Sequence, residues 1–154
     1  MARRRVGNSA TQRSIRLDAL THFDASRNLA ALATELVRRG QDIAAGELVW
    51  GAIVHAVSAA DPDHETQPPD RFGNHHHSPN TMAIFSNAVR RIRERPLSET
   101  QIATCLNNGQ QMLHNHFYHL NLTPQELRFR VRLGAAYAQL LIRAAARALG
   151  QAAP

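Results

Sequence analysis

The chain has 154 residues, 44% of them hydrophobic, which fits one folded domain and excludes an intrinsically disordered chain. Its single cysteine, Cys105, excludes an intrachain disulfide and a cysteine-rich zinc site, and it favours a reducing, cytoplasmic setting. The formal net charge is +6 and there is no lysine, so arginine supplies the positive charge, which favours anionic partners such as nucleic acid.

The first residues, 1–13, predict a flexible basic arm that includes Arg3, Arg4, Arg5 and Arg13. Such an arm either adds solubility or binds phosphate. No apolar segment follows the arginines, so the arm is not a secretory signal. The longest stretch with few polar residues, 48–60, is too short to span a bilayer, and we expect no membrane partner.

Two helices are predicted next. Over 14–39, leucines at 29, 32 and 36 recur at helical spacing, and Gly40 supplies a C-terminal stop. The second helix covers 42–60, between the acidic Asp42 and Pro62. Residues 61–80 hold four prolines and the triplet 75–77 of histidines, which predicts a long loop.

Three helices are predicted in the second half. The first covers 81–95 and stops before Pro96. Two capping boxes, 98–101 and 123–126, open the helices 98–120 and 124–149. With no strand pattern present, we predict an all-α fold, an antiparallel up-and-down bundle of about five helices, as one domain over 14–150.

Within 98–120, one apolar line is expected to face the core; it consists of Ile102, Leu106, Gly109, Leu113 and Phe117. Cys105 lies on the same side, where packing is a better interpretation than nucleophilic chemistry.

The helix 42–60 carries two polar side chains on an otherwise apolar surface. Glu47 and His55 are two turns apart, about 12 Å along the axis, which is too far for a direct bond. Gly51 lies between them and leaves a gap that a side chain or a ligand could fill, with Trp50 beside it. Buried carboxylate and imidazole groups require partners, so the alternative is that both residues bond other helices and fix their register.

The densest chemical signal is the segment 113–119, which packs three histidines beside adjacent phenylalanine and tyrosine. His114 and Tyr118 are one turn apart and share a face. Histidine serves as acid, base or metal ligand near neutral pH. A metal would need His114, His76 and either Glu47 or His55 to converge from three segments; no local ligand spacing supports one, and we predict no metal and no cofactor.

The same residues carry a resemblance. The pattern Leu-His-x-x-Phe-Tyr before a proline-capped helix, together with Glu-x-x-Trp-Gly-Ala at 47–52, resembles the paREP family of the HEPN superfamily over residues 28–148. His116 and His119 depart from the family pattern, which has Asn and Glu there. The resemblance implies a dimer of HEPN-like bundles. It gives no firm activity for paREP proteins themselves.

Many HEPN proteins are ribonucleases whose motif is an Arg and a His with four to six residues between them. Arg71 with His76 fits that spacing, although in a loop rather than on a helix. We therefore predict a protein that binds RNA or a nucleotide and hold metal-independent ribonuclease activity as an open hypothesis. His114 and His76 are the candidate catalytic residues, and the ligand-binding candidates are Glu47, Trp50, His55, Arg71 and Tyr118. The alternative is a non-catalytic protein-interaction bundle whose His/Glu cluster is structural or binds a small ligand.

Overall fold

The computed structural model describes the backbone of residues 6–61 and 79–152, with side chains described over 16–61 and 83–152. Throughout these residues the regular structure is helical, which confirms the all-α prediction. The elements are α1 (Val6–Arg38), α2 (Asp42–Ala60), α3 (Pro79–Arg91), α4 (Glu99–Leu106), the π-helix η3 (Asn107–His114), α5 (Asn115–His119) and α6 (Pro124–Leu149).

The helix ends follow local chemistry. Gly40, with φ of 71°, separates α1 from α2, and Gly150, with φ of 65°, follows α6. Both predicted capping boxes form: the side chains of Ser98 and Thr123 accept hydrogen bonds from the third backbone N–H of α4 and α6. The bounds of α2 and α6 are therefore those that the sequence predicts.

Helix boundaries differ from expectation at several points: α3 begins at Pro79 rather than at 81, and the helix predicted over 98–120 is divided into α4, η3 and α5. α1 begins at Val6, so most of the predicted arm 1–13 is helical rather than extended chain. α3 ends at Arg91, earlier than predicted, because Glu94 and Arg95 have positive φ values of 75° and 40° that no helix accommodates. Of the predicted loop 61–80, residues 62–78 lie outside the described residues.

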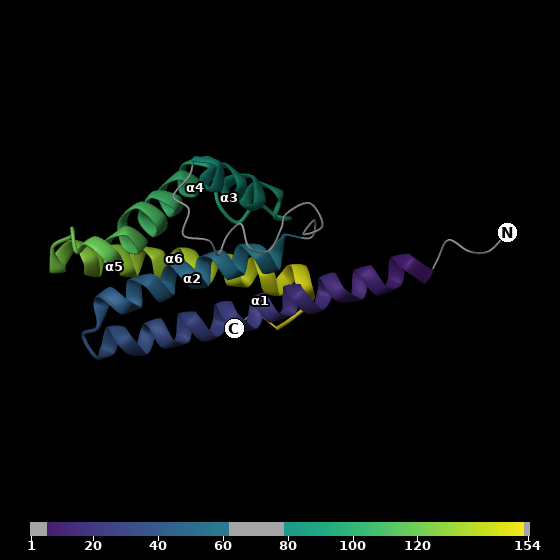
Figure 1. Ribbon diagram of the computed structural model, residues 1–154, viewed down its shortest axis with the longest axis horizontal. Helices are drawn as coiled ribbons and strands as arrows, with labels where there is room; N and C mark the ends of the chain where they lie inside the picture. Colours follow the sequence, from purple (N-terminus) through teal and green to yellow (C-terminus); the bar gives the residue numbers. More distant parts are fainter. Residues whose placement is uncertain (1–5, 62–78, 153–154) are drawn as a thin grey trace.

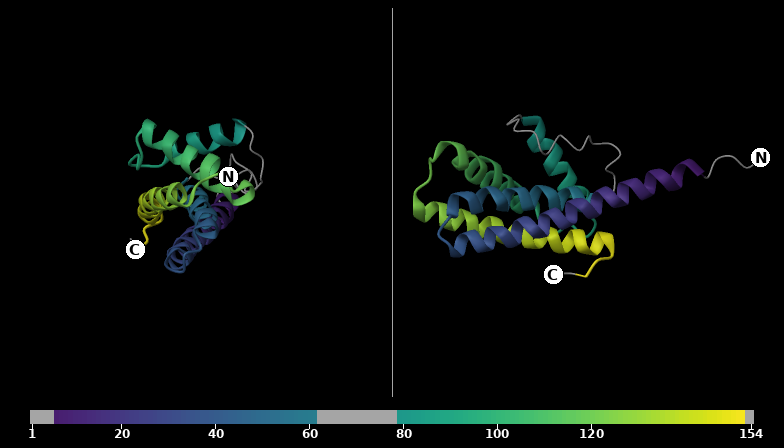
Figure 2. Two further views of the ribbon diagram at one scale, coloured as in Figure 1. Left: turned by 90° about the vertical axis from the view of Figure 1, so that its left-hand side faces the viewer. Right: turned by 60° about the horizontal axis from the view of Figure 1, so that its bottom comes forward.

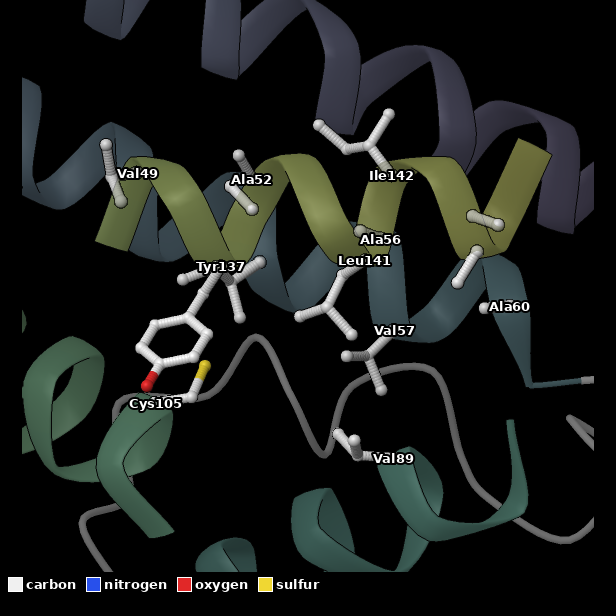
Figure 3. Packing of buried hydrophobic residues seen from close by; sticks show 14 of the residues in the cluster. Val49, Ala52, Ala56, Val57, Ala60, Val89, Cys105, Tyr137, Leu141 and Ile142 are labelled. Atoms are coloured by element: carbon white, nitrogen blue, oxygen red, sulfur yellow. The ribbon is translucent and has the colours of Figure 1, made fainter. Parts of the chain in front are cut away.

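The helices form two layers (Figures 1 and 2). α1, α2 and α6 make the lower layer, with α1 and α6 both packed against α2, and α3 and α4 lie above them. Their shared core is built mainly from alanine, valine, leucine and isoleucine, with Tyr137 of α6 directed toward Cys105 of α4 (Figure 3). Burial raises the pKa of the Cys105 thiol to about 12, so it remains a packing group at neutral pH, as expected.

The π-helix changes which residues face the core. In a π-helix each carbonyl bonds the fifth residue onward, so every turn holds more residues than an α-turn and the following helix is rotated. The predicted apolar line holds as far as Leu113, but Phe117 is 40% exposed. His114 and His116 are buried instead. The prediction was wrong at Phe117 because it assumed α-helical spacing throughout.

α2 approaches the π-helix closely through glycine. A Cβ built on Gly109 would lie 2.2 Å from the Trp50 ring, and one on Gly134 of α6 would lie 2.6 Å from Val49. Asn108, fully buried between them, donates its side-chain N–H to the carbonyl of Arg130 in α6. These contacts hold α2, η3 and α6 together at one register.

α2 is also apolar enough to be compared with a membrane helix. It has 19 residues and a mean hydropathy of 1.5. Among the described helices, it is the one that is long and apolar enough to cross a bilayer. More than half of that stretch, 56%, is buried inside the fold, as in the core helix of many proteins that have no membrane segment. The feature is therefore accounted for by packing.

The close contact at Gly109 predicts a large effect of one methyl group. Gly109→Ala should lower the free energy of unfolding by about 1–3 kcal/mol, because the new Cβ displaces the Trp50 ring from its packed position. Urea unfolding followed by circular dichroism measures this change.

The matched control is Gly51→Ala on α2. There the Cβ would lie 3.2 Å from the flexible end of Leu29, and the gain in helix propensity offsets that contact, so stability should change by less than about 1 kcal/mol. Equal effects of the two substitutions would contradict the proposed packing of Trp50 on Gly109.

Candidate functional site

A short polar contact between segments far apart in the sequence joins His114 of η3 to Glu47 of α2. The His114 Nδ1 lies 2.9 Å from Oε1 and 2.8 Å from Oε2 of the carboxylate. The His114 side chain is 9% exposed and that of Glu47 is 26% exposed. The pair therefore lies at the edge of the core, with the carboxylate more exposed than the imidazole.

The donor and acceptor roles in this pair follow from its chemistry. An ionised carboxylate only accepts hydrogen bonds, so the His114 Nδ1 carries the proton and donates it. The tautomer of the neutral ring is thereby fixed, with the proton on Nδ1 and the lone pair on Nε2. A carboxylate that accepts a hydrogen bond from Nδ1 in this way orients the imidazole, an arrangement that acid–base enzymes use.

Aromatic side chains extend the site to the surface. The Tyr118 ring meets the His114 ring edge-on, with centroids 5.3 Å apart, and the Phe117 ring is 5.1 Å from Tyr118 in the same manner. Tyr118 is 51% exposed and Leu120, just beyond it, is 63% exposed. The result is an exposed apolar and aromatic surface beside a histidine–carboxylate pair, which is suited to a planar ligand.

His116 has a different role from its neighbour. It is buried, and its Nδ1 accepts a hydrogen bond of 2.9 Å from the backbone N–H of Leu122. It thereby satisfies a donor in the turn between α5 and α6, where Leu120 adopts φ of 51°. His116 is a structural residue that fixes the turn next to the site.

His55 does not join Glu47. Its Nδ1 lies 2.7 Å from Nδ1 of His22 on α1, and the two rings are 5.0 Å apart. The Nε2 of His22 lies 3.8 Å from the Asp18 carboxylate. Sequence reasoning missed His22 as a partner, since the two residues are 33 positions apart and no local spacing connects them.

These contacts agree with the second interpretation of the helix 42–60, in which its polar residues bond other helices. Glu47 and His55 each bond a side chain of another helix. Of the two occupants predicted for the gap over Gly51, the structure has the side chain, because Leu29 of α1 lies there. Trp50, expected to stack on a ligand, packs on Gly109 and lies 5.5 Å from Phe85. The structure brings together Glu47, His114 and Tyr118, and it places Trp50 and His55 in other contacts.

Two predicted residues, His76 and Arg71, lie outside the described residues. Over 16–61 and 83–152, no three histidine, cysteine, aspartate or glutamate side chains are grouped so that they could hold a metal ion. In the same part of the chain, Arg91 forms a 2.7 Å ion pair with the buried Asp61, which fixes α3 to the end of α2. The sequence did not predict this ion pair.

Comparison with known proteins finds no family model that matches the chain, no characterised protein of similar sequence and no solved structure of similar fold.

Burial lowers the pKa of His55 below its ordinary value of 6.5, and this predicts a pH dependence of folding. In the unfolded chain His55 takes up a proton near pH 6.5, whereas the folded protein does so only at lower pH. Its contribution to stability is therefore complete above about pH 6.5 and is lost as the pH falls toward the lowered folded pKa.

His55→Asn should remove this part of the acid sensitivity, so that the free energy of unfolding falls less between pH 7.5 and 5.5 than in the wild type. Urea titrations at the two pH values measure it. His119→Asn, at an exposed position of α5, should leave the wild-type dependence unchanged. Parallel pH profiles of the wild type and His55→Asn would refute the prediction.

Proposed function

We propose that this protein binds RNA or a nucleotide at the surface around His114, and that the Glu47–His114 pair supports metal-independent cleavage of RNA. The observation that carries the proposal is the carboxylate on Nδ1 of a nearly buried histidine, next to an exposed tyrosine. The net charge of +6 supports an anionic partner.

The chemistry assigns a role to each residue. Nε2 of His114 would take the proton of an RNA 2′-hydroxyl as its oxygen attacks the adjacent phosphorus, while Glu47 stabilises the imidazolium that forms. The bond from phosphorus to the 5′-oxygen breaks, and that oxygen receives a proton from solvent or a second acid. The products are a 2′,3′-cyclic phosphate and a 5′-hydroxyl. Tyr118 would stack on a base.

The proposed architecture is an HEPN-like, antiparallel up-and-down bundle. The short turn after Arg39 supports it, because it folds α2 back along α1, and the tight turn between α5 and α6 supports it in the same way. Homodimer formation and a cytoplasmic location are part of the same proposal. His76 and Arg71 remain candidates for the second acid and the phosphate contact.

The test is to incubate the protein with a pool of end-labelled RNA, with and without EDTA. Cleavage should persist in EDTA and leave 2′,3′-cyclic phosphate ends. His114→Gln should slow it by about 10²-fold or more, the usual contribution of a general base, and Glu47→Gln by about tenfold or more. His119 is exposed on α5, which follows η3 directly, and His119→Gln should retain the wild-type rate.

Binding is measured in parallel by fluorescence anisotropy with labelled RNA at two salt concentrations. Affinity should fall as salt rises, since counterions are released when arginines contact phosphates. Intact RNA in every lane, together with no salt-dependent binding at low ionic strength, would overturn the proposal.

The second candidate is a non-catalytic interaction bundle. It is favoured by the same contacts, because Glu47 and His55 each link two helices as structural polar residues do. In that case Glu47→Ala or His114→Ala should destabilise the fold by about 1–3 kcal/mol with no activity to lose. A catalytic pair often costs little stability when it is removed, so thermal unfolding of these variants separates the two functions.

A further inference from the structure

A cavity separate from the Glu47–His114 site lies between α1 and α6. It has a volume of about 210 Å³ and is bounded by small and branched apolar side chains. Ala33 and Val49 form part of its buried wall, together with Val131 and Ala138 of α6. Small alanines on both helices leave this space, because α1 and α6 rest on α2 and make far less contact with each other.

The charges around the cavity have one sign. Of the side chains that line it, only Arg38 and Arg132 are charged, and no acidic residue is among them. Arg38 is held loosely, at 3.6 Å, by Glu35. Within the described part of the chain, Arg132 forms no ion pair. An apolar cavity whose charged groups are all arginine is complementary to a molecule with an alkyl body and an anionic end.

We propose that this cavity binds a small amphiphilic carboxylate, such as a medium-chain fatty acid. The alkyl chain would lie against Val49 and Val131, and the carboxylate would bind Arg132. The volume is below the roughly 300–1,000 Å³ of sites for drug-sized ligands, so it selects a small molecule. The cavity is partly open to solvent, and an alkyl chain bound in it would remove its apolar wall from water.

A second, larger cavity of about 500 Å³ adjoins the first and shares Ala30, Thr34 and Gln139 with it. Its charged lining residues, Asp24 and Arg27, have opposite signs. It therefore gives no preference for an anion. It provides space in which a longer alkyl chain could continue along the cleft between α1 and α6.

The proposal is tested with sodium octanoate, titrated below its aggregation concentration into the full-length protein and followed by alanine-methyl NMR shifts. The wild type should bind one equivalent. Arg132→Gln should weaken binding roughly five- to tenfold, as expected for loss of a half-solvated ionic hydrogen bond, and octanol should bind the wild type more weakly by a similar factor.

Two further variants complete the test. Ala135→Leu fills the cavity and should abolish binding while leaving the protein folded, because Ala135 lines the cavity from a partly exposed position. Arg143→Gln, on the same helix but away from the cavity, should bind as the wild type does. No saturable binding, unchanged affinity in Ala135→Leu, or equal affinity for octanol and octanoate would each overturn the proposal.

Discussion

The π-helix Asn107–His114 is the constraint on which the rest of the structure depends. Its wider turn places Gly109 under the Trp50 ring, directs Asn108 to the backbone of α6 and brings His114 to Glu47. An α-helix over the same residues would direct a different set of side chains to α2. π-helical turns are rare and occur often at functional sites, so the location of His114 at the end of one agrees with a role for that residue.

The energetic cost of this arrangement is visible in the core. A π-helix is less favourable than an α-helix, and Oδ1 of Asn108 is buried with no hydrogen-bond partner among the described residues. Such a group costs free energy that packing elsewhere must offset. The dense alanine-rich contact of α2 with α1 and α6 supplies that packing. The well-packed helices thus hold the less favourable π-helix in place, and the Glu47–His114 pair joins that π-helix to α2.

The sequence predicts the helices better than it predicts the site. Glycines and capping boxes are local signals, so the bounds of α2 and α6 follow from neighbouring residues. The partners of Glu47 and His55 lie 67 and 33 residues away, and the pairing depends on how helices pack. Phe117 shows most clearly where prediction from sequence fails. α-Helical spacing places it in the core, but the π-helix, which no residue pattern predicted, turns it to solvent.

The proposed site depends on the hydrogen bond by which Glu47 fixes His114 through Nδ1, and one measurement tests this bond directly. Long-range ¹H–¹⁵N NMR of labelled imidazoles reports which ring nitrogen carries the proton. Neutral His114 should be the Nδ1-protonated tautomer in the wild type and should shift toward the Nε2-protonated tautomer in Glu47→Gln. An Nε2-protonated His114 in the wild type, or a spectrum that Glu47→Gln leaves unchanged, would contradict it.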